Sequence, residues 1–486
     1  MTHHLTRSSG LALALLLALG LHAPAQAQYT PQAYFSPNGG GADATAELID
    51  KATATLDVGM YSISTSGPIW EALKRAIGRG VVVRVVLDGA TSANKSKAQA
   101  LENLGAHVFG VSRTMHQKFA LVDAGIWYRR KLVNGSANWS SGAETRYSEN
   151  TVVYGSHYHL FYAFQQEFNR LLADAQPVSA NAGAHQQPVS LSAPSSKVKR
   201  YERAVFTSQN SGSSTVVADE IIALMQQAQN SIEIDVAHFN SRAIADALIA
   251  IHKAKPQVRI EVLVDLGEYA DSKSRARDLE KGGIPVRYKT YSLAWVHPRS
   301  QLQHHKTILV DGRDLITGSY NWSDTAENSN YENIIVIQGH VSRNKPLAAV
   351  FEAEHRRLWD QNRDLYAPFL QALRSQPGDP DYRRYVPIHF DTNYHQGPMA
   401  LTRSELQKIR SAAWSAGVFN RQPDGKPNSQ FSYLDKETKD VFKGTPSGSF
   451  LPNVNASTVN GLTNALTNSN GNGANNGGND EVDPAD

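Results

Sequence analysis

The stretch that decides the fold reads His304-His305-Lys306-Thr307-Ile308-Leu309-Val310-Asp311 and, six residues later, Gly318-Ser319-Tyr320-Asn321-Trp322. Side chains alternate along an extended strand, so His304 and Lys306 point to the same face. The β-prone residues that follow and a turn at Gly312-Arg313-Asp314 predict a hairpin that returns Gly318, Ser319 and Asn321 to this pair. One imidazole, one ammonium and small hydrogen-bonding groups then converge, which suits the binding of a phosphate.

A His-x-Lys pair alone is also explained by a strand with one polar face, because such pairs arise by chance in a chain with 17 histidines. The pattern occurs a second time, however, as His116-Gln117-Lys118-Phe119-Ala120-Leu121-Val122-Asp123 followed by Gly135-Ser136-Ala137-Asn138-Trp139. Each copy continues with a Glu-Asn pair before an apolar strand, Glu149-Asn150 in the first and Glu332-Asn333 in the second. Repetition of every element favours a duplicated functional unit over coincidence.

These motifs resemble those of the phospholipase D superfamily, which carries His-x-Lys-x4-Asp followed by Gly-Ser-x-Asn. The resemblance covers residues 32–172 and 205–360, and its flanks are most similar to the small nuclease and cardiolipin-hydrolase branch, as at Phe35-Ser36-Pro37. One feature departs from the family pattern, because eleven residues separate Asp123 from Gly135 where the second copy has six. The added residues include Trp-Tyr-Arg-Arg-Lys at 127–131 and predict a lengthened, basic hairpin.

The alternation of helix and strand signals predicts an α/β fold. Residues 55–62 and 81–87 are typical of buried strands between helical stretches, and residues 231–239 and 258–265 repeat the order in the second half. The resemblance implies two similar phospholipase D-like lobes, each a mixed sheet flanked by helices. It also implies that the lobes pack about a pseudo-twofold axis with one active site between them.

The chemistry that the resemblance implies is a double displacement at phosphorus through a phosphohistidine, with no metal or other cofactor. His116 and His304 are the expected nucleophile and acid; the family usually places the nucleophile in the N-terminal copy, while the residues themselves leave the choice open. The two glutamates are expected to fix the imidazole tautomers, and the two aspartates to brace the motif hairpins. The other expected site residues are Lys118 and Lys306 as catalytic cations, Ser136, Asn138, Ser319 and Asn321 as substrate-binding groups, and Asp123, Asp311, Glu149 and Glu332 as supporting groups.

Residues 1–27 predict a secretory signal and hence a secreted or periplasmic protein. Arg7 precedes an apolar run from Leu11 to Leu21 that is too short to span a bilayer, and Ala25-Gln26-Ala27 suits a cleavage site.

The chain contains no cysteine, which excludes disulfides and thiolate metal sites. The predicted segments beyond the signal are lobe 1 (32–175), a linker (176–204), lobe 2 (205–365), a C-terminal extension (366–451) and a disordered Asn/Gly-rich tail (452–486).

We expect the chain to be a monomer, because it holds both motifs. Its sequence is compatible with three functional classes. Secretion and an aromatic insertion before His304, with Tyr288, Tyr291, Leu293, Trp295 and Val296, favour hydrolysis of phospholipid headgroup diesters with peripheral membrane contact. The nuclease-like flanks and the basic hairpin support a secreted, metal-independent nuclease, and the formal net charge of +3 suits either phosphate-bearing substrate. A non-catalytic lipid- or nucleic-acid-binding protein is disfavoured because both motifs retain every reactive group.

Overall fold

The computed structural model describes residues 30–89, 92–155, 157–197, 200–210, 215–290, 301–367 and 398–408. The predicted signal and tail lie outside the described residues. So do four of the five large side chains of the second-lobe insertion, Tyr291, Leu293, Trp295 and Val296.

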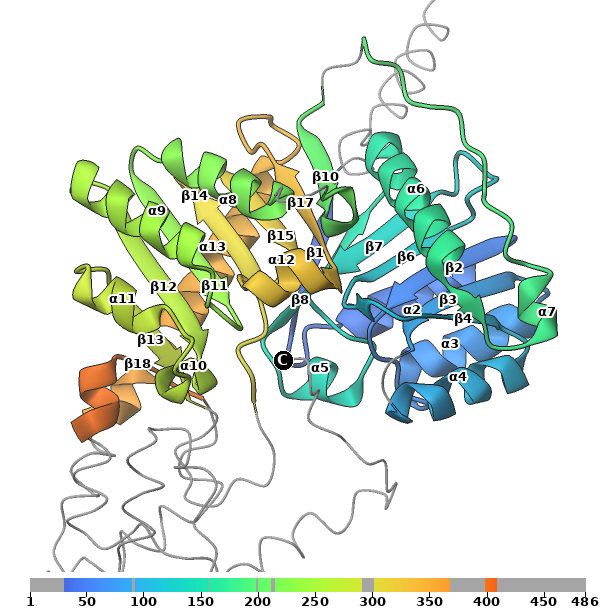
Figure 1. Ribbon diagram of the computed structural model, residues 1–486, viewed down its shortest axis with the longest axis horizontal. Coiled ribbons are helices and arrows are strands. Elements are labelled where there is room, and N and C mark those ends of the chain that lie inside the picture. The colour runs from blue at the N-terminus through green and yellow to red at the C-terminus, as the bar shows by residue number, and fades with distance from the viewer. Residues whose placement is uncertain are drawn as a thin grey trace, which may run out of the picture.

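The first lobe is a mixed eight-stranded sheet in the order β1-β8-β7-β6-β2-β3-β4-β9 (Figure 1). Helices α2, α3 and α4 cover one face of the sheet, and α6 covers the other. Its strands are β1 (Gln32–Ser36), β2 (Thr55–Met60), β3 (Val82–Asp88), β4 (His107–Val111), β6 (Lys118–Val122), β7 (Lys131–Gly135), β8 (Glu149–Tyr154) and β9 (Gln176–Pro177). Its helices are α2 (Gly41–Lys51), α3 (Gly67–Gly78), α4 (Ser92–Leu104), α5 (Ser141–Thr145), α6 (Tyr158–Asp174) and α7 (Ala180–Gly183).

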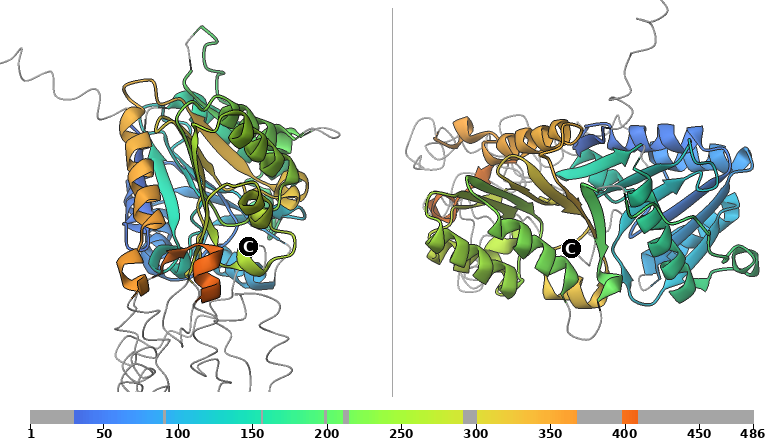
Figure 2. Two further views of the ribbon diagram at one scale, coloured as in Figure 1. Left: turned by 90° about the vertical axis from the view of Figure 1, so that its left-hand side faces the viewer. Right: turned by 90° about the horizontal axis from the view of Figure 1, so that it is seen from above.

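The second lobe repeats this plan in the order β10-β17-β15-β14-β11-β12-β13-β18. Figure 2 shows α13 (orange) on the opposite side of the second sheet from α8 and α9 (green). The strands are β10 (Glu202–Phe206), β11 (Ser231–Val236), β12 (Arg259–Asp265), β13 (Val286–Lys289), β14 (Lys306–Val310), β15 (Asp314–Gly318), β17 (Asn333–Ile337) and β18 (Ala400–Leu401). The helices are α8 (Val216–Gln226), α9 (Arg242–Ala254), α10 (Gly267–Ala270), α11 (Ala276–Lys281), α12 (Asp324–Ser329) and α13 (Lys345–Trp359), with short 3-10 turns η1 (Thr207–Gln209) and η2 (Arg363–Leu365).

The central strands of both sheets are buried on both faces, as their apolar sequences predict. Every residue of β3 except the first is buried, and so is every residue of β11. In each lobe the strand that begins with the motif lysine lies antiparallel to a central strand, which in turn lies parallel to the next one. The predicted α/β fold with two similar lobes, each a mixed sheet flanked by helices, is therefore confirmed.

The two lobes share an apolar core and a short inter-lobe sheet. Phe119 and Phe164 of the first lobe belong to the same buried cluster as Leu309 and Ile335 of the second. Between the lobes, β5 (Thr114–Met115) pairs in parallel with β16 (Asn330–Tyr331). A second parallel bridge joins Ser148 to Gln303. The backbones of the two lobes are therefore paired immediately before each motif histidine.

Two segment boundaries differ from the prediction. The predicted linker begins with β9, which pairs with β4, and ends with β10, which pairs with β17. Residues 400–401 of the predicted extension form β18, which pairs with β13. Segments with the composition of a loop therefore form edge strands of both sheets. An edge strand is held by backbone pairing with one neighbour and needs little apolar periodicity.

Among the described residues, no helix combines the length and apolar character needed to cross a bilayer.

Candidate active site

The motif histidines and lysines lie at the start of two equivalent hairpins, β6–β7 and β14–β15. His116 and His304 are fully buried, and Lys118 and Lys306 are 2% and 1% exposed. Each ammonium donates to the backbone oxygen of its own histidine, at 2.7 Å from Lys118 and 2.9 Å from Lys306. The strand alternation expected from the sequence is the reason for this closeness, since residues two apart share a face.

The motif glutamates pair with the histidines in a crossed manner between the lobes. Nδ1 of His116 lies 2.7 Å from Oε1 of Glu332, and Nδ1 of His304 lies 2.5 Å from Oε1 of Glu149. All four side chains are completely buried. A carboxylate at Nδ1 keeps the proton on that nitrogen, which directs the chemistry to Nε2. Neither lobe by itself completes a histidine–carboxylate pair.

The inter-lobe strands produce this crossing. The backbone N–H of His116 donates to the carbonyl of Tyr331 at 3.1 Å, and Tyr331 directly precedes Glu332. In the same way, the N–H of His304 donates to the carbonyl of Ser148 at 3.0 Å, one residue before Glu149. Each histidine is therefore aligned with the carboxylate of the other lobe through the main chain as well as through the side chain.

The motif serines contact the Glu-Asn pairs rather than an open site. The hydroxyl of Ser319 donates to Oε2 of Glu332 at 2.6 Å. The hydroxyl of Ser136 accepts from the backbone N–H of Asn150 at 2.9 Å and from its side-chain amide at 3.2 Å. Both serines are fully buried. They therefore hold the segments that carry the carboxylates, and a substrate-binding role for the two serines stays a prediction.

The motif asparagines follow β7 and β15, each three residues after the glycine that ends the strand. Asn138 is 7% exposed and Asn321 is 4% exposed. Oδ1 of Asn321 is buried without a hydrogen-bond partner among the described residues. A phosphate-binding role for these two amides stays a prediction.

The motif aspartates lie at the other ends of β6 and β14, away from the histidines. Asp123 and Asp311 both have positive φ angles, 52° and 55°, at the turns of the hairpins. The Asp123 carboxylate accepts backbone N–H groups from residues 53, 54 and 55, and the Asp311 carboxylate accepts those of residues 229, 230 and 231. Each aspartate therefore joins its hairpin turn to the loop that precedes the adjacent central strand.

Two tyrosines that sequence reasoning missed stand beside the histidines. The ring centre of Tyr61 lies 5.1 Å from that of His116, and Nζ of Lys118 lies 5.2 Å from the Tyr61 ring. The ring centre of Tyr147 lies 6.2 Å from that of His304. Tyr61 follows an apolar strand and Tyr147 stands two residues before Glu149, so only the second had a sequence signal, its closeness to the motif.

A buried lysine, Lys289 at the end of β13, was also missed. Its ammonium donates to the hydroxyl of Ser148 at 2.6 Å and to the carbonyl of Leu302 at 3.0 Å. Burial lowers the pKa of Lys289 to about 7, although the nearby Asp265 and Glu149 carboxylates act in the other direction. The apolar pattern of the strand gave no sign that its last residue would be a buried cation.

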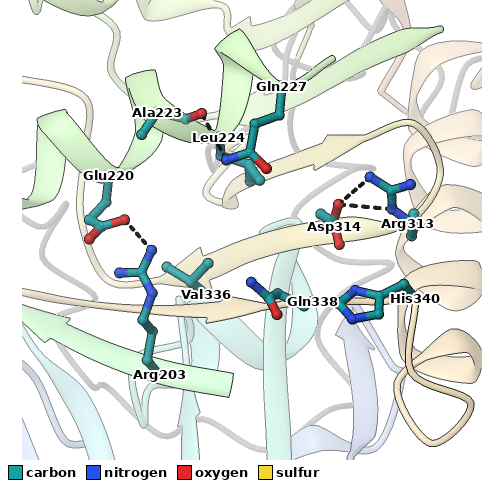
Figure 3. Close-up of a pocket in the computed structure, with 10 residues that line it drawn as sticks. All are labelled: Arg203, Glu220, Ala223, Leu224, Gln227, Arg313, Asp314, Val336, Gln338 and His340. Carbon is teal, nitrogen blue, oxygen red and sulfur yellow. Dashed lines mark hydrogen bonds and ion pairs between the residues drawn. The ribbon is translucent and has the colours of Figure 1, made fainter. Parts of the chain in front are cut away.

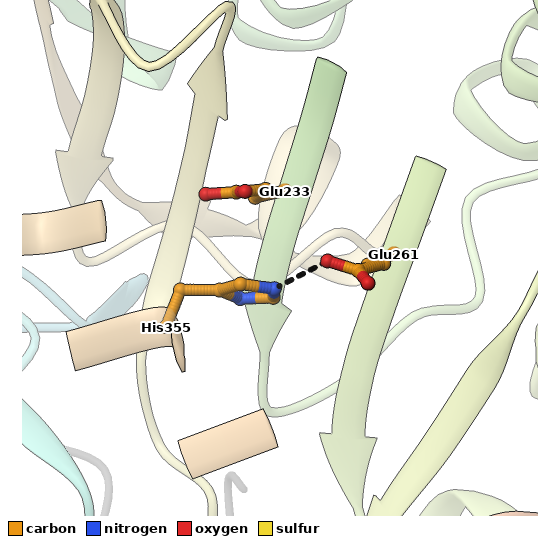
Figure 4. A group of neighbouring side chains, drawn as sticks. All are labelled: Glu233, Glu261 and His355. Carbon is orange, nitrogen blue, oxygen red and sulfur yellow. Dashed lines mark ion pairs between the residues drawn. The ribbon is translucent and has the colours of Figure 1, made fainter. Parts of the chain in front are cut away.

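One group of side chains in the described part of the chain has the composition of a metal site, but it is organised as an ion-pair network (Figure 4). It consists of Glu233, Glu261 and His355, between the second sheet and α13. Arg356 contacts both carboxylates. Burial alone would lower the pKa of His355, but Asp235 and Glu261 outweigh it and raise the pKa to about 9. A protonated imidazole beside a guanidinium does not suit a cation.

A cavity of about 170 Å³ lies in the second lobe at the other end of β15 from the motif glycine (Figure 3). Its charged lining residues neutralise one another, because Arg203 pairs with Glu220, and Arg313 contacts Asp314 at 2.7 Å. The apolar part of its wall comes from Ala223, Leu224 and Val336, and its remaining lining residues are Gln227, Gln338 and His340. The cavity is separate from the histidine pairs.

Where the lobes meet, the two crossed pairs therefore bury two imidazoles and two carboxylates, and the two motif ammonium groups lie next to the histidines. One imidazole can attack an electrophile while the other carries a proton for the leaving group, since ordinary imidazole titrates near pH 6.5. The ammonium groups place positive potential where negative charge would develop on a phosphoryl group.

Comparison with known proteins finds the same duplication. The chain matches the family described as "Cardiolipin synthase, PLD-like domain" twice, over residues 45–172 and 221–359. It is 35% identical to the mitochondrial cardiolipin hydrolase of Danio rerio over 27% of this chain and 52% of that protein. It is 33% identical to the mitochondrial cardiolipin hydrolase of Xenopus laevis over 28% of this chain and 57% of that protein.

Among solved structures, the phospholipase D family member Nuc from Salmonella typhimurium is similar to this chain with 25% identity and a TM-score of 0.27. The similarity covers 32% of this chain and 93% of that structure. The chain thus spans just over half the length of the curated relatives named above.

Proposed function

This chain belongs to the PLD-like domain family of cardiolipin synthase type, within the phospholipase D superfamily, and we propose that it is a phosphodiesterase of phospholipase D type. The observation that carries the proposal is the crossed pairing, between the lobes, of buried His116 with Glu332 and of buried His304 with Glu149. Two imidazoles in equivalent, carboxylate-held positions suit a reaction that needs a nucleophile and an acid at one phosphorus.

The proposed reaction is a double displacement. Nε2 of one histidine attacks phosphorus, a nitrogen–phosphorus bond forms, and the bond to the leaving oxygen breaks as the second histidine donates its proton to that oxygen. Water then gives a proton to the second histidine and attacks phosphorus, and the nitrogen–phosphorus bond breaks with its electron pair returning to the first imidazole. Lys118 and Lys306 stabilise the negative charge that builds on the non-bridging oxygens in both steps.

The reaction as proposed requires no metal ion, because a histidine supplies the nucleophile that a metal-bound hydroxide would otherwise provide. Hydrolysis of bis-p-nitrophenyl phosphate by the purified protein should therefore persist after dialysis against EDTA. Loss of turnover on chelation, with recovery on adding a divalent cation, would count against this mechanism.

The proposed substrates are phospholipid headgroup diesters. Two observations support this choice: the relatives named above are called cardiolipin hydrolases, and the β6–β7 hairpin ends in an exposed aromatic pair. Trp127 and Tyr128 are 77% and 63% exposed, and their ring centres lie 5.6 Å apart. The guanidinium of Arg129 lies 5.8 Å from the Tyr128 ring. Aromatic rings beside basic side chains suit the headgroup layer of an anionic bilayer.

The position of the hairpin bears on the nuclease alternative. The tip follows the last residue of β6, whereas Lys118 is its first, so about 16 Å of strand separates the tip from the histidine centre. Arg130 contacts the lobe itself, since its Nε donates to the carbonyl of Ala124 at 2.8 Å and its guanidinium lies 4.7 Å from the Tyr158 ring. The basic hairpin thus suits a surface tether rather than a groove that leads nucleic acid to the site.

Parallel assays on phosphatidylcholine vesicles, cardiolipin vesicles and single-stranded DNA test the substrate class. Release of headgroup from either vesicle at a rate far above DNA cleavage supports the proposal, and preferential DNA cleavage would replace it with a nuclease. The Trp127→Ala/Tyr128→Ala variant should sediment less with anionic vesicles while keeping wild-type turnover of bis-p-nitrophenyl phosphate. Equal sedimentation of variant and wild type would refute the tether.

We further propose that the protein acts outside the cytoplasm and as a monomer. The signal-like sequence of residues 1–27 supports export, and cell fractionation with N-terminal sequencing of the mature protein tests it. The crossed pairs lie within a single chain, which supports activity without a second copy, and light scattering of the active protein tests this.

A further inference from the structure

The middle residue of each His-x-Lys motif lies on the opposite side of the chain from the histidine and the lysine, because side chains alternate along a strand. This residue is Gln117 in the first lobe and His305 in the second, and the two are 0% and 1% exposed. The same face continues into the apolar cluster that the lobes share, which contains Phe119 and Leu309. Two polar side chains are thus buried beside an apolar core, and such burial is costly unless each is hydrogen-bonded.

Each of these residues contacts an asparagine of the other lobe. Nδ2 of Asn150, in the first lobe, lies 3.0 Å from Nδ1 of His305. Nδ2 of Asn333, in the second lobe, donates to Oε1 of Gln117 at 3.4 Å. Both asparagines are fully buried, and each directly follows a motif glutamate in the chain. These four residues therefore form a second crossed layer, on the opposite face of the strands from the histidine–carboxylate pairs.

The second crossed layer extends to the last long helix of each lobe. Nε2 of Gln117 donates to Oε1 of Glu167 on α6 at 2.7 Å. Nε2 of His305 lies 3.6 Å from Oε1 of Glu354 on α13. An amide donates to Nδ1 of His305 only where that nitrogen has its lone pair, so the ring proton lies on Nε2, toward the carboxylate. Glutamine and neutral histidine thus make equivalent contacts, since each accepts from an asparagine and presents an N–H to a helix carboxylate.

Asn150 joins the first lobe to both sides of the motif hairpin in the second. Besides its contact with His305, just before β14, its Oδ1 accepts the hydroxyl of Thr317 on β15 at 2.9 Å. Its amide also donates to the hydroxyl of Ser136 at 3.2 Å. Glu149 precedes it on β8 and reaches the second lobe from the other face of that strand. The start of β8 is therefore held to the second lobe by side chains on both of its faces.

We propose that Asn150 and Asn333 are positioning residues that, through His305 and Gln117, hold each motif carboxylate in line with the histidine of the other lobe. The inference rests on the proposed function and adds to it a role for the middle residue of each motif. Neighbouring residues of a strand point to opposite faces, so an asparagine bonded on one face keeps the glutamate directed at its histidine on the other. A charge-assisted hydrogen bond depends on distance and angle, so loss of the asparagine contact should weaken the histidine–carboxylate pair.

Turnover of bis-p-nitrophenyl phosphate by variants of His305 tests the second-lobe half of the layer. His305→Met removes the acceptor for Asn150, so kcat should fall by about tenfold, the loss expected for one hydrogen bond. KM should stay within about twofold of wild type, because the changed side chain lies on the face away from the catalytic pair. His305→Gln introduces the side chain that the first lobe uses at this position, so it should restore kcat to within about threefold of wild type.

Double-mutant cycles show which histidine–carboxylate pair each half of the layer acts on. Added to Glu149→Gln, His305→Met should lower kcat by less than about twofold further, because that pair is already weakened. Added to Glu332→Gln, it should keep its full effect of about tenfold. Gln117→Met should show the reverse pattern, with its full effect only in the Glu149→Gln background. A general loss of lobe packing would instead lower kcat equally in both backgrounds.

Leu309→Ala is the matched control, because Leu309 belongs to the apolar cluster shared by the lobes and is not part of the second crossed layer. This variant should lower the melting temperature, since it leaves a cavity in the core, while its kcat stays within about threefold of wild type. The melting temperature of every variant is measured alongside its rate. If His305→Met does not fold, Gln117→Met decides the inference by the same criteria in the other half of the layer.

Each outcome bears on the inference separately from the proposed function. If the wild-type protein does not hydrolyse the diester, the proposed function fails. If it does, a wild-type kcat in folded His305→Met or a failure of His305→Gln to restore turnover overturns the role of the second crossed layer. Equal losses in the two glutamate backgrounds, or the same loss of kcat in Leu309→Ala, would reduce the layer to general packing and overturn it as well.

Discussion

Replacing Glu332 by glutamine tests the crossed architecture most directly. The substitution keeps the size of a completely buried side chain and removes the charge that faces His116 across the lobe boundary at 2.7 Å. Glu332 also accepts the hydroxyl of Ser319 at 2.6 Å and the side-chain amide of Asn330 at 3.3 Å. Because glutamine retains one oxygen, part of this network survives and the lobes should still fold together.

The expected loss follows from the hydrogen bond between the carboxylate and the imidazolium. A hydrogen bond to a charged group contributes about 1.5–3 kcal/mol, so kcat should fall by about 10- to 150-fold. Loss of the anion also weakens the hold of His116 on a proton, so the limb of the pH profile that His116 sets should move to lower pH. The assay is turnover of bis-p-nitrophenyl phosphate from pH 4 to 10, with melting temperature as the folding control.

A double-mutant cycle shows whether the effect passes through the crossed pair. Ser319→Ala should add little to Glu332→Gln, because Ser319 acts through that carboxylate, whereas its effect should multiply with that of Glu149→Gln in the other pair. A folded Glu332→Gln variant with turnover within threefold of wild type at every pH would refute the reasoning.

Four further predictions follow from the structure. His116→Ala and His304→Ala should each abolish turnover, and the double variant should be no worse than either, since nucleophile and acid act as one unit; steady-state rates of the three proteins check this. Lys118→Met should lower kcat by about 100-fold, equivalent to ~3 kcal/mol of lost transition-state stabilisation, with a near-normal melting temperature; a large drop in melting temperature would make the lysine structural. Asp123→Ala should lower the free energy of unfolding by ~3 kcal/mol, measured in urea, because three backbone N–H groups lose their acceptor. The folded pKa of His355, about 9, lies above the ordinary 6.5, so its contribution to stability is fully present below pH 6.5 and is lost as the pH rises through about 9; urea unfolding should show a decline on the order of 3 kcal/mol over that range that His355→Gln lacks.

The sequence predicted which histidine lies beside which lysine, because that contact depends only on local spacing. Residues two apart on a strand share one face of the sheet. Each histidine is therefore expected beside its lysine whatever the rest of the fold is. The positive φ angles of Asp123 and Asp311 likewise belong to turns that the Asp-containing motif predicts. Duplication of the whole pattern then implied two lobes, and the structure has two sheets with equivalent strand orders.

Sequence reasoning was weakest where a segment's role depends on what pairs with it. The segments of β9 and β18 have two residues each and no periodicity, and they become strands only because β4 and β13 offer open edges. The contacts of the motif serines with Asn150 and Glu332 had no sign in the sequence, because they depend on how the strands pair. Propensity and spacing describe a residue's own element, so they carry no information on such neighbours.

By itself, the sequence determined the two-lobed α/β fold, the two histidines and their lysines, since these depend on contacts between residues close together in the chain. The tertiary structure decided which carboxylate serves which histidine. His116 and Glu332 are 216 positions apart, and His304 and Glu149 are 155 apart. Two chemically identical glutamates are equally good partners until the lobes pack and the β5–β16 pairing aligns each with the opposite histidine. The same packing buried Lys289 at the end of β13, because burial is a property of the assembled core and not of a strand's own residues.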